Sequence, residues 1–288
     1  DRPLQLGTQG AYSFIFKRLR KRSRFFYFTL HLPLLNYCLP MSLLALHGFT
    51  GCGADFLPLA QQIGGEWHCP ELPGHGPGSQ LDCSPQGTVD YINKIITHHQ
   101  ASDTTQKILM GYSMGARTAL LHAAYHPEVW DTLILISGNP GIEDETERAN
   151  RRIADAELAD SIERLGMQAF LEFWQETPLI LSQKHITGNL RASMQANRLK
   201  NTSTGLAKSL RQFGQGDAPN LWPELGKLTV PVLLITGEND TKYTIIAQRM
   251  QAVLPHAFHV TIPNASHMPH LEQPDLVIKA IHTFFAGL

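Results

Sequence analysis

The sequence lacks the closely spaced cysteines and histidines that mark metal and redox sites. Its four cysteines (Cys38, Cys52, Cys69 and Cys83) form no CxxC pair, and its 14 histidines form no HExxH motif. We therefore expect no metal and no cofactor. The cysteines are expected to be ordinary thiols in a reducing compartment, which favours a cytoplasmic protein, and a disulfide among them is the alternative.

An excess of either charge is also lacking, as is a long apolar run. The 288 residues carry a formal net charge of −1 at pH 7, which creates no field that attracts nucleic acid. The most apolar stretch, residues 25–35, is interrupted by His31 and Pro33 and is too short to span a bilayer comfortably. The expected partner is therefore a small molecule. The sequence does not determine the oligomeric state, for which we expect a monomer.

Residues 1–40 differ in character from the rest of the chain. They contain seven basic residues and one acidic residue, and the basic stretch 17–24 precedes the apolar run. This is the outline of a signal or transit peptide, but no small-x-small cleavage site follows it. We expect an over-extended translation start or the tail of an upstream segment. A targeting segment and a structural element are the alternatives.

From Ser42 onward, short apolar strands alternate with amphipathic helices. This alternation predicts an α/β fold with a mainly parallel sheet that helices cover on both faces. The alternation stops at residues 139–222, which read as helical and polar. We therefore predict a core of residues 41–138 and 223–288, with a helical cap of residues 139–222 over the carboxyl ends of the strands. The expected strands are residues 43–46, 67–72, 107–111, 133–136, 232–236 and 258–262, and the expected core helices are 89–98, 114–126, 245–253 and 275–285.

The segment Gly111-Tyr112-Ser113-Met114-Gly115 lies between a predicted strand and a predicted helix. This is the context of a nucleophile elbow, in which a tight turn lifts the serine hydroxyl above the sheet. Glycines are expected at both ends because side chains there would strike neighbouring strands. The alternative is a glycine-rich helix start with Ser113 as an N-cap.

Two loops that follow later strands supply partners for Ser113. Serine reacts at neutral pH only when a histidine takes its proton, and an acid holds that histidine in the required tautomer. Asp240 and His267 follow Ser113 in the order that α/β hydrolases use. We therefore predict a triad of Ser113, Asp240 and His267, with Glu238 and His270 as alternatives.

An anion that forms beside Ser113 needs hydrogen-bond donors. The amide of Met114, the residue after the nucleophile, is one expected donor. The second is expected from the loop His47-Gly48-Phe49-Thr50-Gly51, where Phe49 is the candidate.

Several motifs together resemble the 2-succinyl-6-hydroxy-2,4-cyclohexadiene-1-carboxylate synthases, lyases of menaquinone and phylloquinone synthesis within the α/β-hydrolase superfamily. The resemblance runs from Ser42 to Phe285. In the core it rests on residues 47–51, 72–76 and 111–117, and in the predicted cap on residues 137–142 and 147–152, Phe173-Trp174, and Arg198 before Gly205-Leu206-Ala207. The family usually has glycine at the position of Ser266.

The resemblance implies elimination of pyruvate from an enolpyruvyl cyclohexene that carries three carboxylates. The triad serine acts as the base, and the oxyanion hole holds the enolate-like oxygen. Arginine suits carboxylate binding because its planar fork can hold both oxygens. The family pattern implies a substrate site made of Tyr112, Arg117, Arg151, Trp174 and Arg198, and Lys242 is a further candidate.

Three alternatives remain at the level of the sequence. A carboxylesterase would use the same triad through an acyl-enzyme, but a neutral ester would not require the cap arginines. An inactive binding protein of the same fold would not need an intact triad. Arg148, Arg151 and Arg152 could also simply form the solvated side of a cap helix.

Overall fold

The computed structural model describes residues 41–98, 105–186 and 188–288. The predictions for residues 1–40, including Cys38, lie outside the described residues. The described strands form one parallel sheet in the order β2-β1-β3-β4-β5-β6. The strands are β1 Met41–Leu46, β2 Glu66–His68, β3 Gln106–Tyr112, β4 Thr132–Ile136, β5 Val232–Gly237 and β6 Ala257–Ile262.

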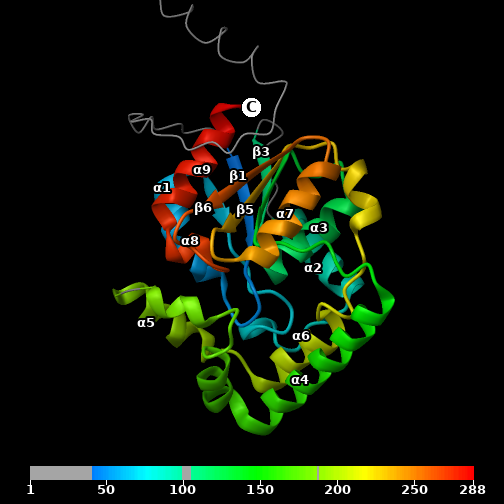
Figure 1. The fold of residues 1–288 in the computed structure, drawn as a ribbon, viewed down its shortest axis with the longest axis vertical. Helices are drawn as coiled ribbons and strands as arrows, with labels where there is room; N and C mark the ends of the chain where they lie inside the picture. Colours follow the sequence, from blue (N-terminus) through cyan, green and yellow to red (C-terminus); the bar gives the residue numbers. More distant parts are fainter. Residues whose placement is uncertain (1–40, 99–104, 187) are drawn as a thin grey trace, which may run out of the picture. The chain divides into compact units, whose positions relative to one another are not determined.

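Helices cover both faces of this sheet (Figure 1). One face packs against α1 (Leu57–Ile63), α8 (Pro269–Glu272) and α9 (Pro274–Ala286), and the other against α2 (Pro85–His98), α3 (Met114–Tyr125) and α7 (Thr241–Val253). Side chains of β1 alternate between the faces, so Leu44 and Leu46 join one core cluster while Leu43 and Ala45 join the other. Burial on both faces explains why the strands are apolar runs and not alternating ones.

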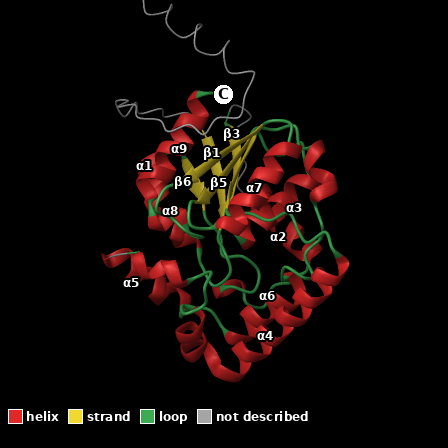
Figure 2. Cartoon of the chain, in the orientation of Figure 1, coloured by secondary structure: helices red, strands yellow, loops and turns green. Residues whose placement is uncertain are grey.

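A helical segment separates β4 from β5 and lies apart from the sheet helices (Figure 2). It contains α4 (Glu145–Trp174), η4 (Leu181–His185), α5 (Gly188–Arg198) and α6 (Ser203–Phe213), and η5 (Trp222–Lys227) leads back to the sheet. We call residues 145–213 the α4–α6 segment. Asp144 caps α4 by accepting the Glu147 N–H, and Gly166, at φ 75°, interrupts the helix. An apolar cluster joins α4 to α6 through Ile162, Phe170 and Leu206, among others.

The structure differs from the sequence prediction at the second strand. Only Glu66–His68 pairs with β1, whereas a strand was predicted through Leu72. Pro70 has no N–H to give to a ladder, and the Leu72 N–H is used by the ring of His47. The chain therefore leaves the sheet early and wraps over the ends of the strands. The short helix α1 was not predicted, and α7 begins at Thr241, earlier than predicted, because Asp240 caps it.

Two further features concern membrane-spanning helices and disulfide bonds. No helix among residues 41–98, 105–186 and 188–288 is long and apolar enough to cross a membrane. Cys52, Cys69 and Cys83 are free thiols.

Candidate active site

Ser113 lies in the sharp turn between β3 and α3. Its backbone has φ 52° and ψ −108°, a conformation that costs energy for any residue with a side chain. Ser113 occupies the N-cap position of α3, but its side chain makes no capping hydrogen bond and contacts His267 instead. A Cβ on Gly115 would lie 1.9 Å from the Leu46 carbonyl oxygen, and a Cβ on Gly111 would lie 2.3 Å from the Gly115 carbonyl oxygen. Both glycines are therefore required by close backbone contacts.

Two loops bring a histidine and an acid to this serine. His267 Nε2 lies 3.0 Å from Ser113 Oγ, and His267 Nδ1 lies 2.7 Å from Asp240 Oδ2. His267 and Asp240 are both buried, at 2% and 8% exposure. Neither alternative takes the place of a triad member, because exposed Glu238 accepts the Asn264 N–H from the loop after β6 and His270 packs against the ring of Tyr112.

The surroundings of His267 hold its ring in place. The ring of Tyr243 lies 4.4 Å away, centroid to centroid, and that of Tyr112 lies 5.6 Å away. Ser266, where the family usually has glycine, is not strained, since the left-handed backbone in this loop falls on Asn264 at φ 56°. The Ser266 N–H donates to Glu272 Oε2 at 2.6 Å, which anchors the loop next to His267.

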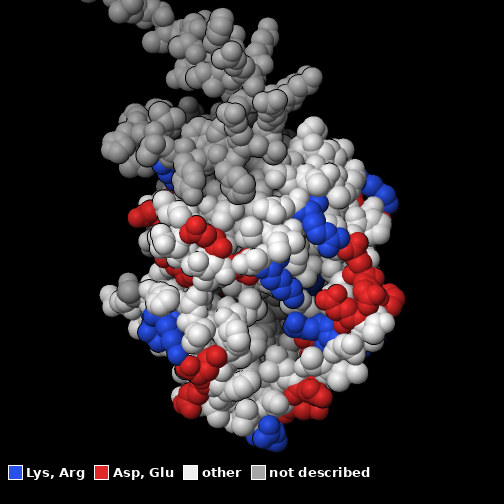
Figure 3. All heavy atoms as spheres, in the orientation of Figure 1, with Lys and Arg blue, Asp and Glu red and all other residues white. Residues whose placement is uncertain are grey.

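The Ser113 hydroxyl opens on a pocket between the carboxyl ends of the strands and the α4–α6 segment. Figure 3 shows this face hollowed, with basic side chains at the edge of the hollow. Besides Ser113 and His267, the lining includes seven of the residues singled out in the sequence: Phe49, Tyr112, Met114, Arg117, Arg151, Trp174 and Arg198. Lys242 is not among the lining residues; it is exposed on the first turn of α7, where Asp240 caps the helix and Tyr243 takes the inward position.

The two expected oxyanion donors border the same pocket. Met114 is the first residue of α3, so its N–H has no acceptor within the helix. Phe49 approaches from the loop after β1, and its ring meets Trp174 edge to face at 5.7 Å. This contact joins the β1 loop to the C-terminal end of α4.

Three arginines from three different helices reach the pocket. Arg117 comes from α3, Arg151 from α4 and Arg198 from α5. Arg117 and Arg198 are buried, and their hydrogen bonds go to neutral oxygens: the Phe213 carbonyl at 2.9 Å and the Gln183 side chain at 2.7 Å. Burial lowers the pKa of Arg117 to about 10 and also lowers the pKa of Arg198, yet Arg117 stays protonated at neutral pH.

These buried cations leave donors unsatisfied. Within the described part of the chain, Arg117 Nε, Arg198 Nε and Trp174 Nε1 have no hydrogen-bond partner. Buried donors without acceptors are costly in a folded protein, more so when they are charged. The wall of the pocket thus contains cations whose hydrogen-bonding capacity is not fully used.

Two residues that hold the pocket arginines were not singled out in the sequence. Asp155 is buried and accepts from Arg151 Nε at 2.8 Å and from the Gly216 N–H at 3.0 Å. Its spacing of four residues after Arg151 is a helical pairing signal. Gln183, which holds Arg198, lies in η4 and carries no such signal. Among the residues that the structure describes, no three His, Cys, Asp or Glu side chains gather as a metal site.

Comparison with known proteins agrees with this architecture. Residues 43–280 match the α/β hydrolase family. A Bacillus subtilis (strain 168) protein provisionally named 2-succinyl-6-hydroxy-2,4-cyclohexadiene-1-carboxylate synthase is 35% identical over 262 residues, which span 86% of this chain and 91% of that protein. The enzyme of that name from Salmonella heidelberg (strain SL476) is 30% identical, over 83% of this chain and 92% of the relative.

A solved structure shows the same relationship in three dimensions. The structure of MenH from S. aureus superposes with a TM-score of 0.80 at 28% identity, covering 88% of this chain and 96% of the MenH chain. The fold and the Ser113 turn therefore agree with the relationship that the sequence comparisons show. The chain belongs to the α/β hydrolase family and, within it, to the 2-succinyl-6-hydroxy-2,4-cyclohexadiene-1-carboxylate synthases.

Proposed function

We propose that this protein is a carbon–oxygen lyase. It eliminates pyruvate from 2-succinyl-5-enolpyruvyl-6-hydroxy-3-cyclohexene-1-carboxylate and forms 2-succinyl-6-hydroxy-2,4-cyclohexadiene-1-carboxylate. The relatives named for this product support the reaction, and the triad and the cationic pocket support its mechanism. The predicted cap of residues 139–222, which contains the α4–α6 segment, covers the substrate, since Arg151, Trp174 and Arg198 line the pocket.

The positions of the double bonds in the substrate, a 3-cyclohexene, and in the product, a 2,4-cyclohexadiene, define the movement of electrons. The C2–H bond, α to the succinyl ketone, breaks, and its electron pair forms the C2=C3 double bond. The C3=C4 double bond moves to C4=C5, and the C5–O bond breaks. The leaving group is the enolate of pyruvate, which becomes pyruvate when it takes a proton on carbon. No atom of the protein enters the product.

Ser113 is the base in this scheme. Its Oγ takes the C2 proton while His267 Nε2, 3.0 Å away, takes the hydroxyl proton. Asp240 fixes the tautomer that leaves Nε2 free to accept and stabilises the imidazolium that forms. The same imidazolium then returns a proton to the leaving group. No acyl-enzyme is needed.

The amides of Phe49 and Met114 stabilise the transition state. Loss of the C2 proton places negative charge on the oxygen of the succinyl ketone. Backbone donors fixed beforehand stabilise that charge more than they stabilise the neutral ketone, which lowers the barrier.

One observation carries the choice of lyase over esterase: three arginines line the wall around Ser113. A neutral ester offers these cations no counter-charge, whereas the proposed substrate offers three carboxylates. Arg117 and Arg198, which hydrogen-bond neutral oxygens, each have capacity for one of them.

The test is the wild-type reaction. Freshly made enolpyruvyl cyclohexene substrate is mixed with the protein, and pyruvate is followed against a control without enzyme, because the elimination also proceeds unaided. A parallel sample contains a simple aryl ester. We expect fast pyruvate release with little ester turnover. Ester turnover without pyruvate release would move the assignment to a hydrolase.

Arg117 provides a prediction about substrate binding. Arg117→Ala is expected to lower kcat/KM for pyruvate release about 100-fold, because it removes a buried cation from a substrate carboxylate. Arg117→Lys should recover only part of this loss, since an ammonium cannot bind both oxygens in a fork.

Arg211→Ala is the matched control for Arg117. Arg211 lies on α6 and is exposed, and its ion pairs are with Asp160 and Glu163 at the surface. Its removal is expected to change kcat/KM less than about twofold. Full activity of Arg117→Ala would refute its role in carboxylate binding.

A further inference from the structure

The loop that carries the Phe49 amide is strained at the next residue. Thr50 is fully buried and has φ 66°, in the left-handed region that residues with a branched Cβ rarely adopt. Such a conformation persists only where surrounding contacts hold it. The contacts of Thr50 therefore decide where the Phe49 N–H points.

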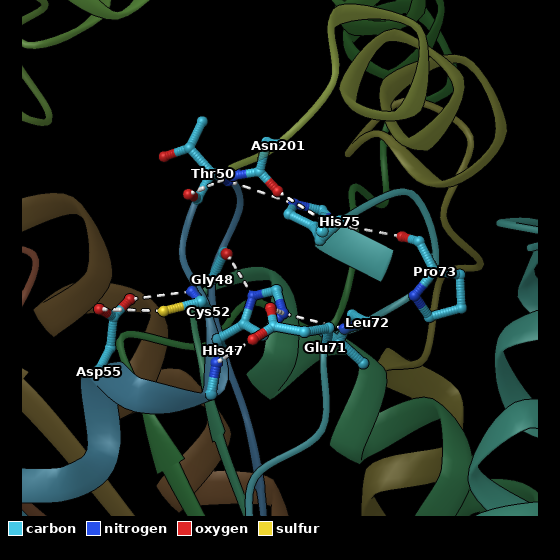
Figure 4. Close-up of polar contacts among 12 residues, drawn as sticks. His47, Gly48, Thr50, Cys52, Asp55, Glu71, Leu72, Pro73, His75 and Asn201 are labelled. Carbon is cyan, nitrogen blue, oxygen red and sulfur yellow. Dashed lines mark hydrogen bonds and ion pairs between the residues drawn. The ribbon is translucent and has the colours of Figure 1, made fainter. Parts of the chain in front are cut away.

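Two side chains from distant parts of the chain hold the Thr50 backbone (Figure 4). The Thr50 N–H donates to His75 Nε2 at 3.3 Å, and the Thr50 carbonyl accepts from Asn201 Nδ2 at 3.0 Å. His75 comes from the loop after β2, and Asn201 comes from the turn between α5 and α6. Both are buried. The loop conformation thus depends on residues 25 and 151 positions away in the chain.

His75 is held in the state that this contact needs. Its Nδ1 lies 3.2 Å from the Pro73 carbonyl, an acceptor, so the proton sits on Nδ1 and Nε2 is free to accept. Burial, with a smaller contribution from His47, lowers the pKa of His75 to about 3. The ring is therefore neutral at neutral pH.

Asn201 connects the loop to the substrate-binding part of the α4–α6 segment. Its Nδ2 donates to the Arg198 carbonyl at 3.1 Å as well as to Thr50, and its Oδ1 accepts the Gly76 N–H at 2.9 Å. One side chain therefore joins three segments: the end of α5, the β1 loop and the loop after β2. None of these bonds requires substrate.

We propose that Asn201 is a positioning residue for the oxyanion hole, acting with His75 to fix the Thr50 backbone so that the Phe49 amide points at the developing anion. The inference rests on the proposed function in one respect, the use of the Phe49 amide as a donor. Asn201 does not touch the reacting atoms. It acts through the conformation of the β1 loop.

Asn201→Ala tests this through the kinetics of pyruvate release. Misplacing one oxyanion donor should lower kcat by about 10- to 100-fold, toward the loss seen when such a donor is removed. KM should change less than about threefold, because the arginine side chains remain. An unchanged kcat would overturn the proposal. A raised KM with unchanged kcat would also overturn it, because Asn201 would then act through Arg198.

Thr202→Ala is the matched control. Thr202 is the next residue and caps α6 by accepting the Gly205 N–H at 3.1 Å, and its side-chain hydrogen bonds are with Gly205 and Thr204, not with the β1 loop. Thr202→Ala removes a hydrogen bond from the same turn, and it should leave kcat within about twofold of the wild-type value. An equal fall in kcat in both variants would mean that Asn201 has only a structural role.

A second measurement does not depend on the natural substrate. An alkyl fluorophosphonate reacts when Ser113 Oγ attacks phosphorus, fluoride leaves, the hydroxyl proton passes to His267, and the phosphoryl oxygen enters the oxyanion hole. Asn201→Ala should slow this labelling by a factor similar to its effect on kcat, and Thr202→Ala should not. If Asn201→Ala were labelled as fast as the wild type, the inference would be overturned.

The two assays separate the inference from the function on which it rests. If the wild type releases no pyruvate but Asn201→Ala still slows labelling, the proposed function fails and the positioning role stands. If Asn201→Ala does not fold, Asn201→Asp replaces it, because an ionised Asp keeps the acceptor for the Gly76 N–H and loses the donations to the Thr50 and Arg198 carbonyls. Melting curves establish which variants are folded.

Discussion

Ser113→Ala is expected to release pyruvate about 1,000-fold more slowly than the wild type, with KM nearly unchanged. In the proposed mechanism Ser113 Oγ takes the C2 proton, and positioned bases contribute about 100- to 10,000-fold to a rate. The arginines and amides remain, so the substrate still binds. Alanine keeps the Cβ of serine and adds no strain at φ 52°. The measurement is steady-state pyruvate release, corrected for the unaided elimination.

The chain offers a close control for this substitution. Ser137 follows β4, beside the turn that holds Ser113, and it is buried with φ 48°. Its hydroxyl is not part of the pocket lining. Ser137→Ala should therefore keep kcat within about threefold. If Ser113→Ala kept more than about a tenth of the wild-type rate, His267 or another group would be the base.

The elbow and the order of the triad could be predicted because they depend on local sequence. A strand, the motif from Gly111 to Gly115 and a helix together specify the turn, and the structure gives the close contacts that exclude side chains at both glycines. The loops of Asp240 and His267 follow strands that are themselves apolar runs. Parallel strands end at one edge, so these loops meet without any further signal.

The parts that escaped prediction depend on contacts between distant segments. Asn201 and Thr50 are 151 residues apart, and nothing in either neighbourhood indicates the partner. Gln183 holds Arg198 across a turn with no periodic pattern. The second strand was predicted too long because its apolar composition was visible, whereas the ring of His47, which takes the Leu72 N–H, comes from another strand end. Lys242 was expected near the site because it is near Asp240 in sequence, but the first turn of α7 points it outward.

The folded protein is also expected to lose most of its stability between pH 6.5 and about 4.5. In the described part of the chain, burial lowers the pKa of five histidines to about 3 or 4: His47, His75, His122, His259 and His270. The same side chains titrate near pH 6.5 in an unfolded chain. Below that pH the unfolded chain binds more protons than the folded one, so the free energy of unfolding falls as the pH falls.

The size of this effect follows from the pKa difference. Each such histidine removes about 1.4 kcal/mol per pH unit below 6.5, or about 2 kcal/mol by pH 5. Asp55 and Glu71 act in the opposite direction, since burial raises the pKa of each carboxyl and the folded state then binds protons more readily. Because five histidines oppose only two carboxyls, the net loss in the free energy of unfolding is comparable to the whole stability of a typical domain, about 5–15 kcal/mol.

Urea denaturation at pH 7, 6 and 5 measures this loss, and one substitution isolates a single contributor. His259 lies on the edge strand β6, away from the triad, and bonds Thr236 Oγ1 at 2.8 Å. His259→Gln should reduce the slope of the unfolding free energy against pH by about 1.4 kcal/mol per pH unit, the contribution of one proton. Glutamine can still hydrogen-bond Thr236, but it does not titrate. His256→Gln, at an exposed position just before β6, should leave it unchanged. A free energy of unfolding that stayed constant from pH 7 to pH 5 would mean that the buried rings accept protons inside the fold, and the neutral state of His75 that the β1 loop depends on would then not hold.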